Sequence, residues 1–395
     1  MLNIYHHQLQ NGLSVLLIQR KNFYSLYACL SIKTGSANED KNNNGISHLL
    51  EHIIFSRTYT LEYPFLADEI NAETGEDFTT YELFSSCDQK EKTIKILADL
   101  IQEPDWPNTD LKKEKNIVAE EIKEYTDSPW EKLNNTIKKY MYPDHPLSLP
   151  VPGNINNISK LKLEDLKDWY HRTCSPNNMF LVLVGDIAKE STQKEIKKHF
   201  EGISAGKNQP PPVPELPPPY KRKRIKQADN NFSRTYFALI FPTSTPAYPY
   251  MAKIMLLHEI LEQHFNPIFN KNDLYYDIDL EYPNNFYAGE FRFSGACSAS
   301  NLTKIEKQIR NELDKLNITP KQFREAKEYL VNRMQIKKDN LKELGGNTLY
   351  YFLEIKELKN VDDEIRVIKD TSLAEIKTMK EKIFSEENGY LFAVN

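Results

Sequence analysis

Cysteine is scarce in this chain. Its 395 residues include only four cysteines, at positions 29, 87, 174 and 297, and no two of them form a Cys-x-x-Cys pair. This spacing excludes a disulfide-stapled scaffold and a thiolate metal site, and it is typical of a protein from a reducing compartment.

Long apolar runs are absent as well. No stretch approaches the ~20 apolar residues that a membrane-spanning helix needs. The first 22 residues have neither a charged segment before a long apolar core nor the Arg-rich, acid-poor composition of a transit peptide. We therefore expect no membrane span and a cytoplasmic protein of the bacterial type.

An excess of positive charge is missing too. The formal net charge is −5, and the one basic run, Lys221 to Arg224, is too short to indicate nucleic-acid binding by itself. With 40% hydrophobic and 27% charged residues, the composition is that of a globular protein with a charged surface. A chain of this length is expected to form two domains.

Proline is concentrated in one segment. Seven prolines lie between Pro210 and Pro219, and such a segment is extended and cannot supply the backbone hydrogen bonds of a helix or sheet. It predicts a first domain at 1–205, a linker at 206–224 and a second domain at 225–395.

The two halves end alike. Residues 162–186 (KLEDLKDWYHRTCSPNNMFLVLVGD) and 372–395 (SLAEIKTMKEKIFSEENGYLFAVN) share Leu, an acidic residue, Leu or Ile and then Lys, followed by a Ser-x-x-Asn turn and an apolar strand. A match at the same relative place in both halves indicates a duplicated unit.

Strand and helix patterns alternate in both halves. Apolar and β-branched runs predict strands at 13–20, 25–35, 177–186, 235–242 and 288–297. Apolar spacing of three and four predicts helices at 45–55, 110–129, 251–265 and 318–344, and a strand running into a helix at 83–104. This mixture predicts an α+β fold of two similar domains, each an antiparallel-rich sheet covered by helices.

The helix at 45–55 (GISHLLEHIIF), opened by Gly45 and capped by Ser47, carries the first candidate site residues. His48 and His52 lie one turn apart and can present two imidazole nitrogens to one ion, and Glu51 shares their face. A catalytic zinc needs three protein ligands and one open position, and a nearby carboxylate can move the proton of the attacking water. The alternative is an ordinary amphipathic helix, and a third ligand decides between the two.

The helix at 110–129 offers candidates for that ligand. Glu114 and Glu121 are two turns apart on one face, whereas Glu120 points about 100° away. One carboxylate can bind a metal while the other accepts a hydrogen bond from a ligating imidazole. Acidic residues on helices are ordinarily solvated, so the spacing alone leaves the assignment open.

These motifs resemble those of the pitrilysin and mitochondrial processing peptidase family. The His-x-x-Glu-His pattern at 48–52 is similar to the inverted zinc motif of the inverzincins. The likeness spans nearly the whole chain and includes LQNGLSVLLIQ (9–19), TGSANEDKNNNGISHLLEHIIF (34–55), LKKEKNIVAEEIKEYTDSP (111–129) and the stretch 145–187.

The resemblance implies a zinc-dependent endopeptidase that cleaves short or unfolded peptides, precursor peptides among them. It implies that His48, His52 and Glu121 ligate Zn²⁺, that Glu114 supports them and that Glu51 activates the water. Members of the family hold the peptide extended along a sheet edge, in a chamber formed by two pairs of domains on one chain or on two subunits.

Two departures from the family pattern concern substrate binding. Where the family has an Asn-Ala pair on the edge strand, the alignment places Glu76 and Asp77, so Glu76 is a candidate substrate contact. The family's arginine and tyrosine, seven residues apart, correspond to Phe269 and Tyr276, so only Tyr276 is kept. Because a fixed donor stabilises the developing oxyanion, we expect a heterodimer in which a homologous subunit supplies the arginine, with a homodimer as the alternative.

Two non-catalytic interpretations compete with the peptidase. A scaffold subunit of a heteromeric complex is expected to have a degraded metal motif, and here the motif is complete. A peptide-binding module with a structural zinc needs a fourth ligand, and His258 and His264 are six positions apart, on opposite sides of their helix.

Overall fold

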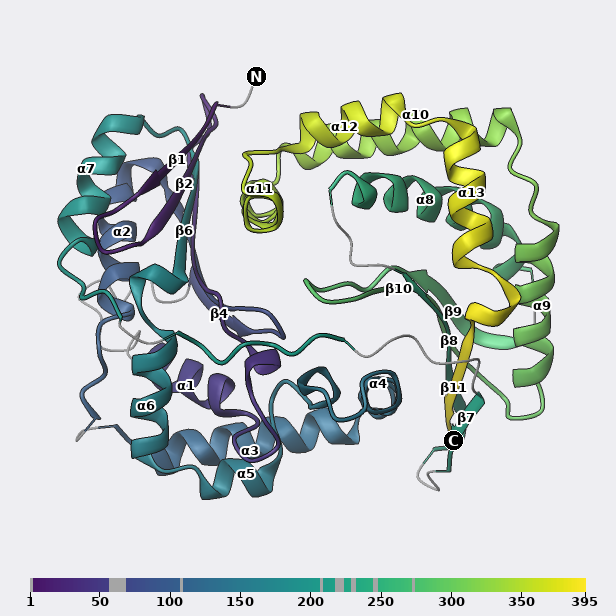
Figure 1. The fold of residues 1–395 in the computed structure, drawn as a ribbon, viewed down its shortest axis with the longest axis horizontal. Helices are drawn as coiled ribbons and strands as arrows, with labels where there is room; N and C mark the ends of the chain where they lie inside the picture. The colour runs from purple at the N-terminus through teal and green to yellow at the C-terminus, as the bar shows by residue number, and fades with distance from the viewer. Residues whose placement is uncertain are drawn as a thin grey trace. The chain divides into compact units, whose positions relative to one another are not determined.

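The computed structural model describes residues 3–56, 69–106, 109–206, 209–216, 224–228, 232–243, 248–271 and 274–395. Helices and two mainly antiparallel sheets make up this part of the chain, which confirms the predicted α+β fold (Figure 1). None of the helices described is both long and apolar enough to cross a membrane.

Two compact units are present. Unit 1 comprises Met1–Tyr125, Asp144–Glu215 and Lys338–Leu358, and unit 2 comprises Thr126–Pro143, Leu216–Lys337 and Lys359–Asn395.

Unit 1 contains a sheet of six strands. Their order is β1-β2-β6-β3-β5-β4, with β2 and β6 parallel and every other neighbouring pair antiparallel. The strands are β1 (Asn3–Gln8), β2 (Ser14–Gln19), β3 (Ser25–Ile32), β4 (Ile70–Thr74), β5 (Thr79–Ser86) and β6 (Met179–Gly185). Among the residues described, β4 therefore forms one edge of the sheet.

Unit 2 contains a sheet of five strands with the same plan. Their order is β7-β11-β8-β10-β9, with β7 and β11 parallel and the other neighbours antiparallel. The strands are β7 (Arg224–Gln227), β8 (Thr235–Thr243), β9 (Tyr275–Glu281), β10 (Gly289–Cys297) and β11 (Tyr390–Val394). The order and the directions of these five strands match those of β2-β6-β3-β5-β4 in unit 1. This match agrees with the predicted duplication.

The chain ends that look alike in sequence also fold alike. In unit 1, α6 (Leu163–Thr173) leads through a 3₁₀ turn into β6, and in unit 2, α13 (Leu373–Ile383) leads through a 3₁₀ turn into β11. The Asn178 amide donates to the carbonyl of Thr173 at 3.0 Å, and the Asn388 amide donates to that of Ile383 at 2.6 Å. Each bond reaches the last residue of its helix, so the shared Ser-x-x-Asn turn joins helix and strand in the same way.

Two helices belong to the unit opposite to their half of the sequence. α4 (Pro129–Met141) belongs to unit 2 and packs against β8 and β11, whereas α11 (Leu341–Ile355) belongs to unit 1 and packs against β2, β3 and β6. The division into 1–205 and 225–395 stays a prediction about domains, and the compact units cut across it at these helices. The other helices are α1 (Ile46–Phe55), α2 (Lys90–Leu100), α3 (Leu111–Asp127), α5 (Ile155–Lys160), α7 (Lys189–Phe200), α8 (Tyr250–Phe269), α9 (Leu302–Lys315), α10 (Pro320–Lys337) and α12 (Val361–Asp370).

One predicted helix is divided. The helix expected over 318–344 is α10 followed by α11, with a break at 338–340. The side chain of Asn340 accepts a hydrogen bond from the backbone N–H of Glu343 at 3.2 Å. Asparagine in this position starts a new helix, because it satisfies an N–H group that has no acceptor within the helix.

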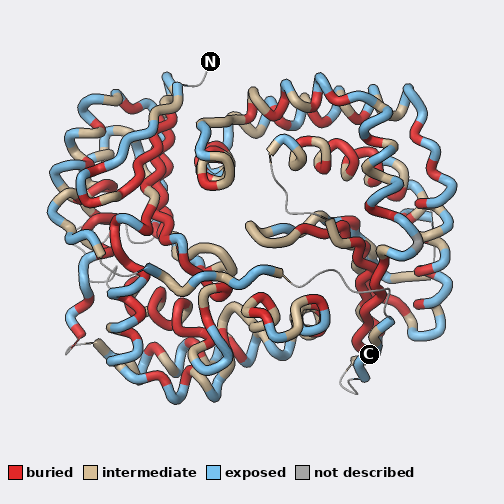
Figure 2. Tube along the Cα trace, viewed as in Figure 1, coloured by how far each residue is buried: buried red, intermediate tan, exposed pale blue. Residues whose placement is uncertain are grey.

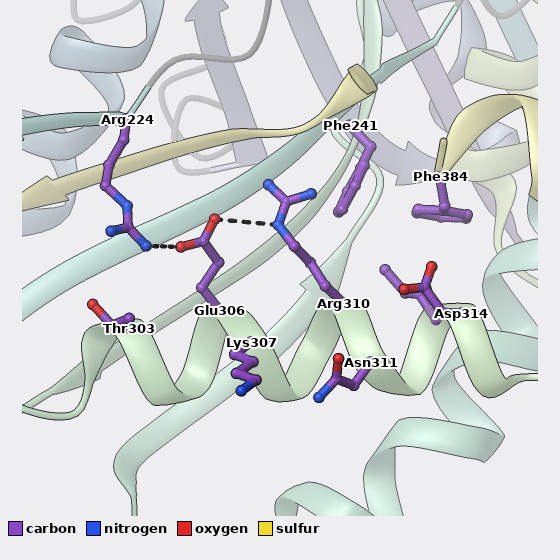
Figure 3. A pocket seen from close by; sticks show the side chains of 10 residues that line it. Arg224, Phe241, Thr303, Glu306, Lys307, Arg310, Asn311, Asp314 and Phe384 are labelled. Carbon is purple, nitrogen blue, oxygen red and sulfur yellow. Dashed lines mark hydrogen bonds and ion pairs between the residues drawn. The ribbon is translucent and has the colours of Figure 1, made fainter. Parts of the chain in front are cut away.

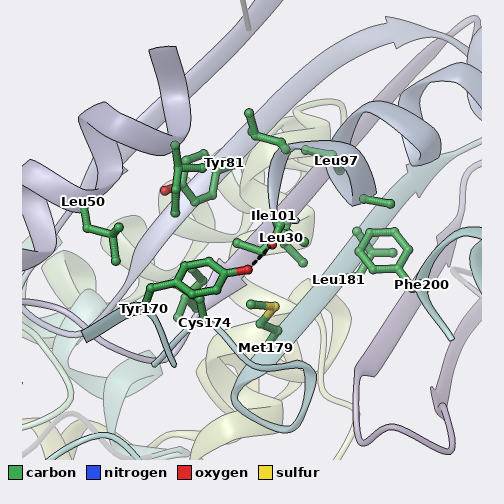
Figure 4. Packing of buried hydrophobic residues seen from close by; sticks show 14 of the residues in the cluster. Leu30, Leu50, Tyr81, Leu97, Ile101, Tyr170, Cys174, Met179, Leu181 and Phe200 are labelled. Atoms are coloured by element: carbon green, nitrogen blue, oxygen red, sulfur yellow. Dashed lines mark hydrogen bonds between the residues drawn. The ribbon is translucent and has the colours of Figure 1, made fainter. Parts of the chain in front are cut away.

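The core of unit 1 lies between its sheet and the helices that cover it. The inner strands of both sheets are largely buried (Figure 2), and in unit 1 Tyr81, Leu181 and Phe200 pack with apolar residues of α1, α2 and α6 (Figure 4). The hydroxyl of Tyr170 in α6 donates to the carbonyl of Ile101 at 2.9 Å. The residues of α1 that enter this core are Ile46, Leu49, Leu50, Ile53 and Ile54.

Candidate metal centre

Two helices bring together the three predicted ligand residues. His48 and His52 lie one turn apart on α1, and Glu121 lies on α3. Glu121 Oε2 is 3.5 Å from His48 Nε2 and 3.2 Å from His52 Nε2, and the two Nε2 atoms are 3.3 Å apart. The three donor atoms therefore form one small triangle.

The triangle has the dimensions of a zinc site. Two ligand atoms that are each about 2.1 Å from a tetrahedral ion are about 3.4 Å apart, close to all three separations. Burial and the neighbouring His52 lower the pKa of His48 to about 4. The His48 ring is therefore neutral at physiological pH, which is the form that binds metals. Donor chemistry and spacing both fit Zn²⁺.

Glu51 faces the same cavity from α1 and is only 7% exposed. Its Oε2 accepts a hydrogen bond from the hydroxyl of Thr74, on β4, at 3.0 Å. Burial raises the pKa of Glu51 to about 7; the Thr74 hydrogen bond opposes this shift, and the charges of Glu121 and Glu73 add to it. A carboxyl group with such a pKa can both accept and release a proton near neutral pH.

Glu114 and Glu121 approach opposite sides of one imidazole ring. Glu114 Oε2 is 3.8 Å from His52 Nδ1, whereas Glu121 lies beside Nε2 of the same ring. A separation of 3.8 Å is too long for a hydrogen bond, but it places a buried carboxylate next to Nδ1, on the side of the ring away from Glu121. Burial raises the pKa of Glu114. Glu120 points elsewhere and pairs with Lys123 at 2.6 Å, as its predicted orientation requires.

A cavity of about 480 Å³ surrounds the cluster. Its lining residues all belong to unit 1, and β4 forms one of its walls. The lining consists of His48, Glu51, His52, Phe55, Asn71, Ala72, Glu73, Thr74, Glu121, Tyr125, Val151 and Pro152.

The predicted position of the edge strand is wrong. The strand is β4, Ile70–Thr74, and it carries an Asn-Ala pair at Asn71 and Ala72. Glu76 and Asp77 follow it in the turn to β5, and neither lines the cavity. Apolar alternation could not reveal β4, because an edge strand with exposed polar side chains has little of it. The Asn-Ala pair at positions 71 and 72 is the sequence signal that identifies this edge strand.

Ser47 was expected to cap α1 and does not. The helix begins after Gly45, whose φ of 95° lies in the left-handed region that favours glycine. Ser47 lies within the first turn, and its hydroxyl oxygen accepts a hydrogen bond from Trp169 Nε1 at 3.2 Å. This bond joins α1 to α6.

Tyr276, the candidate substrate contact in unit 2, lies on β9 and is 62% exposed. The guanidinium carbon of Arg234 lies 4.1 Å from the centre of its ring. No arginine was found near Tyr276 in the sequence because this one comes from the residue just before β8, 42 positions earlier.

In the described part of the chain, the other group of side chains that could hold a metal ion is already ion-paired. Glu91, Glu195 and His199 come within 4.8 Å of one another, but Lys198 Nζ is 2.6 Å from Glu91 and 3.5 Å from Glu195. His258 contacts the carbonyl of Leu280, and His264 lies beside Glu312, so these two histidines have separate partners.

A pocket of about 280 Å³ in unit 2 is lined by charged side chains of both signs (Figure 3). Glu306 pairs there with both Arg224 and Arg310. A carboxylate shared between two guanidinium groups is not free to bind a cation.

Two family models match the chain. Residues 14–154, which include the whole triangle of donor atoms, match the insulinase or M16 peptidase model, and residues 160–330 match the model described as the M16 peptidase inactive domain.

Known proteins resemble the chain in sequence and in fold. It is 24% identical over 394 residues to the uncharacterized zinc protease YmxG of Bacillus subtilis, covering 96% of this chain and 95% of that protein. It is 26% identical over 214 residues to the mitochondrial-processing peptidase subunit beta of Saccharomyces cerevisiae, covering 52% of this chain and 46% of that protein. A protease from Helicobacter pylori has the same fold, with a TM-score of 0.89 at 20% identity and complete coverage of both chains.

Proposed function

Because the chain belongs to the M16 family of peptidases, we propose that it is a zinc-dependent endopeptidase that cleaves short or unfolded peptides. One observation carries this proposal. His48, His52 and Glu121 converge at zinc-ligand distances in a cavity that also contains the buried carboxyl group of Glu51.

Six polar residues in and beside the cavity have a role in this proposal. His48, His52 and Glu121 would hold the zinc ion, and Glu114 would orient the His52 ring from behind. Zinc, when bound, supplies a Lewis acid that makes water nucleophilic at neutral pH. Glu51 accepts the proton of the attacking water and returns it to the amine nitrogen that leaves. Thr74 holds the Glu51 carboxyl group towards the cavity through its hydrogen bond.

The substrate would lie along β4. An edge strand offers unpaired backbone groups to which an extended peptide can add as a further strand. Because Asn71 and Ala72 line the cavity and Glu76 does not, we move the proposed substrate contact from Glu76 to this pair. Peptides that are already extended or unfolded bind in this way without first losing structure.

The decisive experiment measures zinc and hydrolysis together. The purified chain is expected to bind one equivalent of zinc and to cleave unstructured peptides. Glu51→Gln is expected to keep the zinc and to lose about 10²–10⁴-fold in kcat. If this variant keeps full activity, Glu51 is not the base. If the wild-type chain binds no zinc, the peptidase proposal fails. Zinc binding without any hydrolysis, alone or with a homologous chain, would favour the non-catalytic scaffold or peptide-binding subunit.

We retain the proposal that a homologous subunit completes the substrate site, with a homodimer as the alternative. A relative named as a subunit supports it. Arg234 beside Tyr276 provides a competing explanation, because this chain then has its own arginine next to the tyrosine. Full activity of the isolated chain would refute the need for a partner. An increase in KM in Arg234→Ala would then identify the chain's own arginine as the substrate contact.

We also propose a cytoplasmic location. All four cysteines are free thiols, and three of them are buried. Unpaired cysteines are typical of a reducing compartment. Fractionation of cells that express the tagged chain tests this, and recovery outside the cytoplasm would contradict it.

A further inference from the structure

Glu39 lies at the start of α1 and uses both of its carboxylate oxygens there. Its side chain is almost fully buried. Oε2 accepts hydrogen bonds from the backbone N–H of Gly45 at 2.7 Å and from the Asn44 amide at 3.0 Å. Oε1 accepts one from the backbone N–H of Ser47 at 2.9 Å. A residue outside the helix therefore performs the role of a capping side chain.

α1 has no capping side chain of its own. Its N-cap residue, Gly45, has no side chain, and its first turn contains no acidic residue. The first N–H groups of a helix lack acceptors within the helix, and its N-terminus carries partial positive charge. Glu39 supplies both an acceptor and a negative charge. Burial raises the pKa of Glu39, and hydrogen bonds from Gly45, Ser47 and Asn44 oppose this by favouring the charged form.

The same carboxylate also restrains a second wall of the cavity. The Asn44 amide that donates to Glu39 also donates to the carbonyl of Pro150 at 2.9 Å. Gly45 and Gly153 are in such close contact that a Cβ on Gly153 would lie 2.6 Å from the Cα of Gly45. Val151 and Pro152, which lie between Pro150 and Gly153, line the cavity. Glu39 thus connects the helix that carries both histidines to the wall beside them.

We propose that Glu39 is a positioning residue whose carboxylate sets the placement of α1, and with it the separation between the two histidines and Glu121. The inference rests on the proposed function, because it takes these three residues as the zinc ligands. His48 directly follows Ser47, so any shift of the first turn moves its ring relative to Glu121 on α3. Zinc–ligand distances vary by only about 0.2 Å between sites, so a small shift weakens binding.

Glu39→Gln tests the proposal. The amide keeps the size of the side chain but turns one acceptor into a donor that faces an N–H group. The zinc Kd, measured by competition with a coloured chelator, is expected to rise about 10–100-fold, as for other residues that orient zinc ligands. The visible spectrum of the Co²⁺-loaded variant is expected to change, and kcat to fall more than KM changes. Glu190→Gln, at an exposed position in the first turn of α7 in the same unit, is the matched control and should leave all three unchanged.

The outcomes separate this inference from the proposed function. A folded Glu39→Gln variant, checked by circular dichroism without metal, that has the wild-type zinc Kd and cobalt spectrum would overturn the positioning role. If that variant does not fold, Asn44→Ala removes the amide bonds to Glu39 and Pro150 and is expected to raise the zinc Kd by about tenfold. An unchanged Kd in Asn44→Ala would also overturn the role. A wild-type chain without zinc affinity refutes the proposed function itself.

Discussion

At the scale of the residue, four glutamates near the candidate site differ only in their surroundings. Glu51 and Glu114 are buried, the Glu121 side chain is 44% exposed beside two imidazole nitrogens, and the Glu120 side chain is 70% exposed beside Lys123. Burial raises the pKa of Glu51 and Glu114 because it disfavours the charged form. One residue type can therefore serve as base, ligand, support or solvated surface.

Glu121 and Glu120 form a matched pair for testing the ligand assignment. Glu121→Gln removes the charge that faces both Nε2 atoms and is expected to lower zinc affinity by about 100-fold or more, because a neutral amide oxygen is a weak ligand for zinc. Glu120→Gln removes the same charge one position earlier and should leave the affinity unchanged. Chelator competition measures both, and equal affinities would place the third ligand elsewhere.

Glu364, in the first turn of α12, links stability to pH. Burial raises its pKa to about 8, and the charge of Lys337 only partly opposes this. An acid whose pKa is raised on folding contributes stability below its unfolded pKa of about 4.5, and this is lost as pH rises towards 8. Glu364→Gln should therefore be more stable than the wild type at pH 8.5, by on the order of 3 kcal/mol, and similar to it near pH 4.5.

Urea unfolding at several pH values measures this difference. Glu381→Gln, at an exposed position on α13, is the control and should follow the wild type at each pH. If the difference between Glu364→Gln and the wild type stays constant between pH 5 and 8.5, the assignment of the buried titrating group is incorrect.

At the scale of the element, α11 depends on a glycine where it meets the sheet of unit 1. A Cβ on Gly345 would lie 3.0 Å from the ring of Tyr27 and 3.2 Å from methyl groups of both Val182 and Val184, whereas one on Gly346 would contact nothing within 4 Å. These adjacent glycines share one helix. They therefore separate the effect of packing from that of helix propensity.

Alanine at the two positions should have opposite effects. Gly346→Ala is expected to stabilise the protein by about 0.5–1 kcal/mol, because alanine loses less backbone entropy in a helix. Gly345→Ala is expected to destabilise it by about 1–3 kcal/mol, because its methyl group overpacks the contact with the sheet. Denaturant unfolding measures both, and equal changes would show that α11 does not pack as described.

At the scale of the whole molecule, the two halves of the chain each provide a helix that the other unit uses. Leu133, Ile137 and Met141 of α4 join a core cluster with residues of β8 and β11 in unit 2. α11 covers β2, β3 and β6 in unit 1. A cut in the proline-rich segment therefore removes a covering helix from each sheet.

Fragments 1–205 and 225–395 test this exchange. Each fragment alone is expected to lack a cooperative thermal transition and to aggregate, because a buried sheet face becomes exposed. Together they are expected to form a 1:1 complex with a single transition, measured by gel filtration and calorimetry. Two independently folded, monomeric fragments would contradict the exchange and favour domains that follow the linear division of the sequence.

Much of the fold could be predicted because its patterns are local. Apolar periodicity located the buried strands β2, β3, β6, β8 and β10 and the helices α1, α2, α3, α8 and α10, and the Ser-x-x-Asn repeat anticipated the matching ends of the two sheets. The polar edge strand β4 was missed because exposed side chains leave no apolar period. The break between α10 and α11 was missed because its signal is one capping asparagine at position 340.

The sequence by itself determined that His48, Glu51 and His52 share a helical face and that Glu114 and Glu121 share another, because 3.6 residues per turn place them there in any fold. Only the tertiary structure decided that these faces meet, that Glu39 caps α1 and that the edge strand carries Asn71 and Ala72. The first of these contacts joins residues 69 positions apart (121 − 52), and the other two depend on a loop hydrogen bond and on strand pairing. Such contacts depend on how the elements pack, and they leave no period in the sequence.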